Sequence, residues 1–214
     1  MAEVRRSALV LLVASALVAG CSDDDPAGQA SPPSTTTTAP VDTTSSESTT
    51  TTVEPAPSAI ALRGDGLAVV DLGADPDVAV EAVIAELGEP TVDTGWESSF
   101  SSYGTCPGRQ IRGVEWDGLV LLFTDGETDH GTGPHLFTWR VTGPSPPIAT
   151  VEGLGYGATG ADAEELYAGM VERVPAEEPF PAFLRIAGEG GQITAYLDDT
   201  DTITNLEAGT GCGE

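Results

Sequence analysis

The stretch Arg109–Thr124, "RQIRGVEWDGLVLLFT", decides the fold of the C-terminal part of this 214-residue chain. It contains two apolar segments that are separated by Asp117 and Gly118. An Asp-Gly pair between two such segments is the strongest short-range signal for a tight β-hairpin. The stretch 136–141, "LFTWRV", follows, and its apolar residues alternate onto one face. We therefore predict a three-stranded antiparallel meander in this part of the chain.

A helix is predicted before this meander, in the stretch 74–90, "ADPDVAVEAVIAELGEP". Asp75 is a good N-cap residue, Pro76 suits the first helical position, and Gly88 provides a C-terminal stop. A short strand is predicted just upstream, in the stretch 67–73. The apolar face of the helix consists of Val80, Val83, Ile84 and Leu87.

The chain then repeats this order of elements. A short strand is predicted over 148–155, followed by a helix over 161–174 in which Asp162 and Glu165 form a capping box. The predicted buried face of this helix consists of Leu166, Met170 and Val174. Three further strands are predicted over 182–187, 192–198 and 202–208.

The order strand, helix, three-strand meander thus occurs twice, over about 62–143 and 148–214. A meander buries one face of its sheet, and the preceding helix is the obvious cover for that face. We therefore predict an α+β fold in which the helices pack on one face of an antiparallel sheet.

The N-terminus has the layout of a secretory signal peptide, which we assign to residues 1–20. Arg5 and Arg6 precede an apolar run over 8–19, and small residues follow it. The run is shorter than the roughly 20 residues that a membrane-spanning helix needs. We therefore expect export of the chain instead of a retained transmembrane helix.

The sequence "LVAGC", which ends at Cys21, resembles the lipobox of bacterial lipoproteins. The resemblance implies cleavage after Gly20 and a lipid thioether on Cys21, which would anchor the exported protein to the outer face of the cell membrane. The alternative is a soluble secreted protein in which Cys21 is a free thiol. An exposed free thiol would be reactive in an oxidising compartment.

The segment 21–57 is predicted to be a disordered tether between the lipid and a globular domain over 58–214. It is rich in Ser, Thr and Pro and shows no apolar periodicity. Burial therefore cannot offset the entropy lost on ordering. Within the globular part, "YGTCPG" (residues 103–108) and the ending "AGTGCGE" are similar to a domain of uncharacterised actinobacterial lipoproteins. The layout also resembles the tandem-repeat fold of the β-lactamase-inhibitor-protein type. Neither resemblance implies a known activity.

Cys106 and Cys212 are the two cysteines of the globular part, and we predict that they form a disulfide. The alternative is a two-cysteine metal site or redox pair. The sequence offers little support for that alternative, because it contains no C-x-x-C motif.

The charge of the chain is strongly negative. The formal net charge is −26, and none of the eight basic residues is a lysine. Nucleic-acid binding requires a basic footprint, so we expect no nucleic-acid partner. Electrostatic attraction to anionic lipid is disfavoured for the same reason.

Motifs for catalysis and cofactor binding are weak. The stretch 155–160, "GYGATG", matches G-x-G-x-x-G, but it lacks the alternating strands and helices of a dinucleotide-binding fold. His130 and His135 lie in an acidic stretch, and carboxylates and imidazoles in one loop could hold Zn²⁺ or Ca²⁺. The spacing matches no EF-hand and the pair is not on a helix, so we favour a solvated hairpin loop. We predict no cofactor and no metal site.

The stretch 96–104, "WESSFSSYG", is the best candidate binding loop, because aromatic side chains among small polar residues suit recognition surfaces. Its candidate residues are Trp96, Phe100 and Tyr103. We predict a non-enzymatic domain that binds a protein or an envelope component, with the membrane contacted through the lipid. The alternatives are a cell-wall enzyme that uses a pair of carboxylates and a passive structural surface protein.

Overall fold

The computed structural model describes residues 60–188 and 190–213. The predicted α+β fold class is wrong: 49% of the structure is β-strand and 12% is helix, and the strands are mostly antiparallel. The helices are α1 (Pro76–Leu87) and α2 (Gly160–Leu166). The strands are β1 (Leu62–Arg63), β2 (Gly66–Leu67), β3 (Val70–Asp71), β4 (Val92–Asp93), β5 (Glu97–Ser101), β6 (Gly104–Trp116), β7 (Leu119–Thr124), β8 (Glu127–Thr128), β9 (Gly131–Thr132), β10 (His135–Val141), β11 (Val171–Val174), β12 (Phe183–Gly188), β13 (Gly191–Leu197) and β14 (Ile203–Gly209).

One antiparallel sheet contains nine of these strands, in the order β11-β12-β13-β14-β10-β7-β6-β4, with β5 also paired to β6. The two predicted meanders are parts of this sheet, because β10 pairs with β14 from Thr138↔Gly209 to Val141↔Leu206. Joining the meanders removes two exposed strand edges, which would otherwise leave backbone groups unpaired. The chain therefore builds a continuous sheet in place of two sheets that are each covered by a helix.

The hairpin predicted from Asp117 and Gly118 is confirmed. Trp116 pairs with Leu119 across this two-residue turn between β6 and β7. The φ angle of Asp117 is 52°, in the left-handed region that Asp tolerates better than most residues.

The helix predicted before the first meander is also confirmed, because α1 has the expected bounds and caps. The Asp75 carboxylate accepts a hydrogen bond from the Asp77 N–H at 3.0 Å, and the Gly88 N–H donates to the Ile84 carbonyl at 2.8 Å. Val80 is among the buried residues of this helix.

The second predicted helix is wrong over most of its length. Helix α2 ends at Leu166, and Val171–Val174 forms strand β11 beside β12. Gly169, beyond the C-cap Tyr167, has a φ of 80°, which is incompatible with a helix that continues to Val174, and the β-branched valines that follow favour a strand. The capping box is formed by Thr159 and Asp162 instead of Asp162 and Glu165. Residues Leu166 and Met170, which were predicted to be buried, are exposed, and Val174 is half-buried.

The short strands predicted before each helix also differ. The stretch 67–73 contributes to a small three-stranded sheet formed by β1, β2 and β3. The stretch 148–155 forms no strand and makes only isolated bridges, Leu62↔Thr150 and Ala149↔Gly155.

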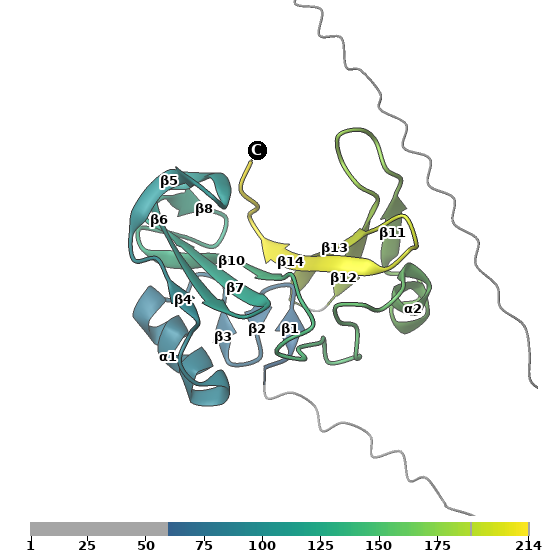
Figure 1. Ribbon diagram of the computed structural model, residues 1–214, viewed down its shortest axis with the longest axis horizontal. Helices are drawn as coiled ribbons and strands as arrows, with labels where there is room; N and C mark the ends of the chain where they lie inside the picture. The colour runs from purple at the N-terminus through teal and green to yellow at the C-terminus, as the bar shows by residue number, and fades with distance from the viewer. Residues whose placement is uncertain (1–59, 189, 214) are drawn as a thin grey trace, which may run out of the picture. The chain divides into compact units, whose positions relative to one another are not determined.

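The two faces of the large sheet are covered differently. The inner face packs against α1, the small sheet β1–β3, the loop around Leu154, and Ala163 and Tyr167 at α2, and together they form the main core. The outer face carries a second, smaller apolar cluster. This outer cluster consists of Cys106, Ile111, Val120, Leu122 and Phe137, with Tyr103 and Cys212 packed against it. In Figure 1, α1 and β1–β3 lie on one side of the sheet, and the chain end and the loop between β11 and β12 extend from the other.

Candidate functional site

The stretch predicted as a binding loop forms a β-hairpin, which we call the aromatic hairpin (residues 96–105). Strand β5 pairs with the start of β6 through Phe100↔Thr105 and Ser101↔Gly104 (Figure 1). The Ser98 hydroxyl accepts a hydrogen bond from the Phe100 N–H at 3.2 Å, and that of Ser101 accepts from the Tyr103 N–H at 3.2 Å. The serines therefore fix the backbone of the hairpin and its turn.

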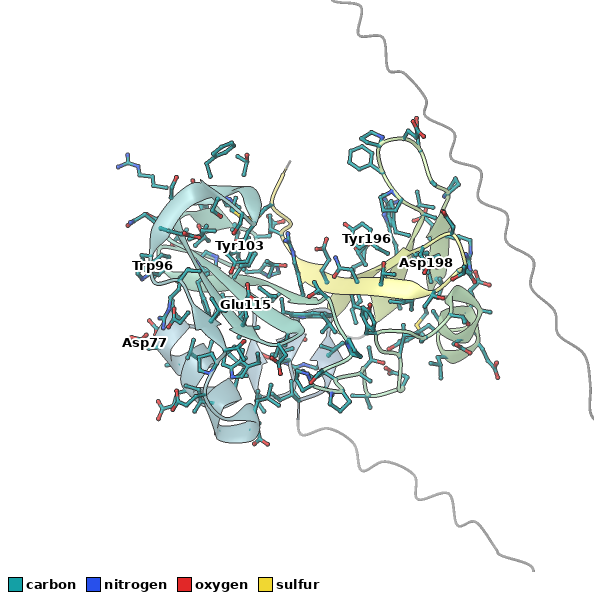
Figure 2. All side chains as sticks on the ribbon, viewed as in Figure 1. Asp77, Trp96, Tyr103, Glu115, Tyr196 and Asp198 are labelled. Carbon is teal, nitrogen blue, oxygen red and sulfur yellow. A yellow bond between two sulfur atoms is a disulfide. The ribbon has the colours of Figure 1, made fainter. Side chains whose placement is uncertain are left out.

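The three predicted aromatic residues do not share one environment. The side chain of Phe100 is 77% exposed and that of Trp96 is 39% exposed. Tyr103 is half-buried against the outer cluster and lies apart from Trp96 in Figure 2. Phe100 and Trp96 are therefore available to a partner, whereas most of Tyr103 is used within the fold.

Tyr103 fixes the aromatic hairpin to the sheet. Its hydroxyl donates to the Glu115 carboxylate at 2.6 Å, and its ring lies directly over Gly113. Burial and the neighbouring Glu115 raise the pKa of the Tyr103 hydroxyl above its usual value. Tyr103 thus stays protonated and keeps donating to Glu115 at neutral pH.

A disulfide holds the base of the aromatic hairpin. Cys106 and Cys212 are joined across a sequence separation of 106 residues, which confirms the predicted pair. The chain end is also hydrogen-bonded to β6, because Thr105 and Gly213 exchange two backbone hydrogen bonds of 2.6 and 2.9 Å. Residues 210–213, which we call the C-terminal strap, therefore lie against the outer cluster.

The segment of β6 that follows Cys106 is fixed by the next turn of the chain. The Asp125 carboxylate accepts hydrogen bonds from the backbone N–H groups of Arg109 and Gln110, at 2.7 and 2.9 Å. These bonds lower the pKa of Asp125. The Thr124 hydroxyl donates to the Pro107 carbonyl at 2.7 Å. Side-chain bonds, the disulfide and Tyr103 together make the hairpin a rigid support for its exposed rings.

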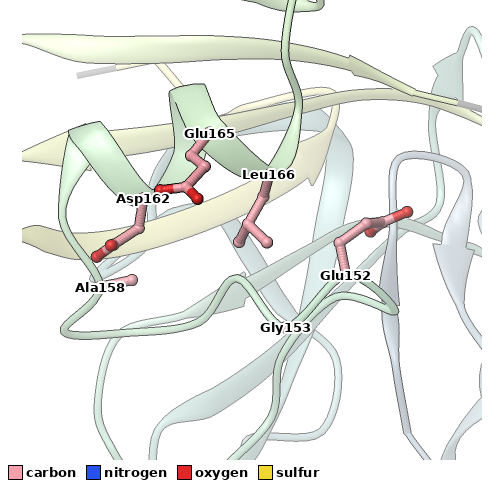
Figure 3. A pocket seen from close by; sticks show the side chains of 6 residues that line it. All are labelled: Glu152, Gly153, Ala158, Asp162, Glu165 and Leu166. Carbon is pink, nitrogen blue, oxygen red and sulfur yellow. The ribbon is translucent and has the colours of Figure 1, made fainter.

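A shallow pocket of about 380 Å³ lies between the 152–158 loop and α2 (Figure 3). Three carboxylates line it, from Glu152, Asp162 and Glu165, beside the exposed Leu166. The Tyr167 hydroxyl donates to Glu152 at 2.5 Å and lowers its pKa. Hydrogen bonds from the backbone and the hydroxyl of Thr159 likewise lower the pKa of Asp162.

These pKa shifts bear on the carboxylate-pair alternative. A glycosidase needs one carboxylic acid whose pKa is raised so that it can donate a proton near neutral pH. Both shifts in this pocket go the other way, and the Asp162 carboxylate is already used to cap α2. Glu152 and Asp162 therefore lack the raised pKa that a general acid needs.

The two histidines occupy different environments. His135 is buried, with its Nδ1 2.7 Å from the Gly133 carbonyl and its Nε2 2.7 Å from the Thr128 hydroxyl. This ring closes the loop that carries β8 and β9, so the prediction of a solvated hairpin loop is wrong for His135, which is buried. His130 is half-buried. Within the described part of the chain, no group of three His, Cys, Asp or Glu side chains is close enough to hold a metal ion.

The G-x-G-x-x-G match leads into α2, where Thr159 is the N-cap residue. The large sheet around it is antiparallel in all its pairings, unlike the parallel sheet of a dinucleotide-binding fold.

Two exposed aromatic residues were not predicted from the sequence, Tyr156 and Phe180. Phe180 is 58% exposed and lies in the loop between β11 and β12. The signal that could have found it is the pair of flanking residues, Pro179 and Pro181, which disfavour burial in a helix or a central strand.

Cys21 and the tether lie outside the described residues. Among residues 60–188 and 190–213, no helix is both long and apolar enough to cross a membrane. Comparison with protein-family models, curated proteins and solved structures found no match to this chain.

Proposed function

We propose that this protein is a lipid-anchored, exported binding module, in which a Ser/Thr/Pro-rich tether displays a non-enzymatic domain at the cell envelope. The lipobox-like "LVAGC" supports attachment through Cys21. The Cys106–Cys212 disulfide is consistent with an oxidising compartment. The observation that carries the binding role is the exposure of Phe100 and Trp96 on a rigid hairpin.

Rigid aromatic side chains are effective binding residues. Aromatic side chains are enriched among the few residues that dominate interface energies. A ring on a fixed backbone loses little conformational entropy when a partner covers it. Phe100 meets both conditions, because its ring is exposed while its own N–H is bonded to Ser98.

The partner is a protein or another envelope component with a neutral or cationic surface. The described residues carry six arginines and 25 acidic side chains, so an anionic partner would be repelled. Five of the six arginines are already paired with acidic residues.

The test is capture of envelope components by the full mature chain. We expect Phe100→Ala combined with Trp96→Ala to weaken capture of the specific partner by about 30-fold, the size of a strong interface residue. Val151→Ala is the matched control, because this residue is 76% exposed and belongs to another loop. Unchanged capture by the double variant would show that the aromatic hairpin is not the binding surface.

A further inference from the structure

The loop between β11 and β12, residues 175–182, presents Phe180 on a fixed backbone. Glu177 and Phe180 exchange two backbone hydrogen bonds, of 3.1 and 2.7 Å, which close a tight turn. Three prolines, at positions 175, 179 and 181, further restrict the loop. Figure 1 shows this loop extending from the sheet between its two strands.

The base of the loop is also rigid. Phe183, the first residue of β12, has its ring 5.8 Å from that of Tyr196 on β13. The Arg185 guanidinium lies 5.3 Å from the centre of the Phe183 ring and is paired with Glu172 at 3.2 Å. These contacts hold the side chains at the base of the loop against one another. The Phe180 ring takes no part in them and is exposed.

The charge around Phe180 is negative. Glu177 and Glu178 are both exposed, and neither makes an ion pair in the described part of the chain. An exposed ring beside two unpaired carboxylates is complementary to an apolar pocket that has basic residues at its rim.

We infer that Phe180, Glu177 and Glu178 form a second interaction surface, which inserts the phenyl ring into an apolar pocket rimmed by Lys or Arg on a partner protein. The ring is the group that the partner buries. The carboxylates orient the two proteins and raise their rate of association through charge attraction. This surface is separate from the aromatic hairpin, so it does not depend on the function proposed above.

Other occupants fit the loop less well. Two pockets of the described residues are acidic and would not suit this loop on a second copy of the chain: the pocket near α2 is lined by three acids, and the pocket beside the end of α1 contains Glu89 and Asp117. Anionic lipid would be repelled by Glu177 and Glu178. An apolar pocket with a basic rim on a partner protein is complementary to both the Phe180 ring and the two carboxylates.

The test is photo-cross-linking from position 180. The full chain carries the photoreactive residue benzoylphenylalanine in place of Phe180 and is irradiated in intact envelopes, with the same residue at position 151 as control. We expect a protein cross-link from position 180 that is absent from position 151. The cross-linked peptide should contain apolar residues with Lys or Arg beside them.

One variant tests the role of the two carboxylates, and a second variant is its control. Glu177→Gln with Glu178→Gln should reduce the cross-link several-fold at low salt and less at high salt, because screening weakens charge attraction. Val151→Ala should leave the cross-link unchanged, because this residue is exposed but belongs to another loop. Cross-linking only to lipid or to a second copy, no specific cross-link, or equal yield from the Gln variant would each overturn the inference. Circular dichroism of each variant controls for folding.

Discussion

Gly113 shows how one missing side chain positions another. A Cβ atom at this position would lie 2.4–2.6 Å from three atoms of Tyr103, including its hydroxyl oxygen. The Tyr103 ring can therefore lie flat on β6 and reach Glu115 only because position 113 is glycine.

We predict that Gly113→Ala destabilises the protein by about 1–3 kcal/mol, the usual cost of overpacking, because the Tyr103 ring must move away from β6. Urea-induced unfolding measures this change in the free energy of unfolding. Gly211→Ala is the matched control, because its nearest neighbouring atom would be 3.9 Å from the new Cβ.

A double-variant cycle checks the cause. With Tyr103→Ala already present, Gly113→Ala should cost nothing or be mildly stabilising, since alanine is preferred to glycine within a strand. An equal cost of Gly113→Ala in both backgrounds would contradict the proposed clash.

The environments of some single side chains could not be predicted from the sequence. The stretch 96–104 indicated three candidate rings, but spacing could not show that Tyr103 turns toward Cys106 while Phe100 faces solvent. That difference depends on Gly113, ten residues beyond Tyr103, and on Cys212 near the far end of the chain. The burial of His135 could not be predicted either, because the path of the loop places Thr128 and Gly133 against its ring.

Among the elements, the C-terminal strap depends most on one bond. The disulfide closes a loop of about a hundred residues, for which the chain-entropy model gives roughly 4–5 kcal/mol. We predict that reduction with a dithiol lowers the free energy of unfolding by about this amount. Reduction should also increase hydrogen exchange at Thr105 and Thr210, whose N–H groups are bonded to Gly213 and Phe137.

The Cys106→Ala/Cys212→Ala variant is the control for the reductant. It should resemble the reduced protein and should not respond further to the dithiol. A reduced protein with unchanged stability would show that the strap is held by its other contacts.

Local signals identified some elements and missed others. The caps of α1 and the Asp-Gly turn act within a few residues, and both were predicted correctly. The stretch 161–174 shows helical periodicity, but its valines are used as edge strand β11 because β12 offers a pairing partner. Pairing between β10 and β14 joins segments about 70 residues apart, which a reading of local pattern does not specify.

At the scale of the whole molecule, the proposed role combines a signal for export and lipid anchoring with a binding surface. The proposed localisation is argued from the first 21 residues, and the binding surface from the exposure of Phe100 and Trp96. In this proposal export links the two, since an oxidising compartment favours the Cys106–Cys212 bond that supports the hairpin.

Mass spectrometry of the mature N-terminus in cells that produce the full chain tests this account most directly. The account predicts that the mature protein begins at Cys21 and that its thiol carries a diacylglyceryl group. An unmodified Cys21, or cleavage at another position, would contradict the proposal that this protein is a lipid-anchored envelope module.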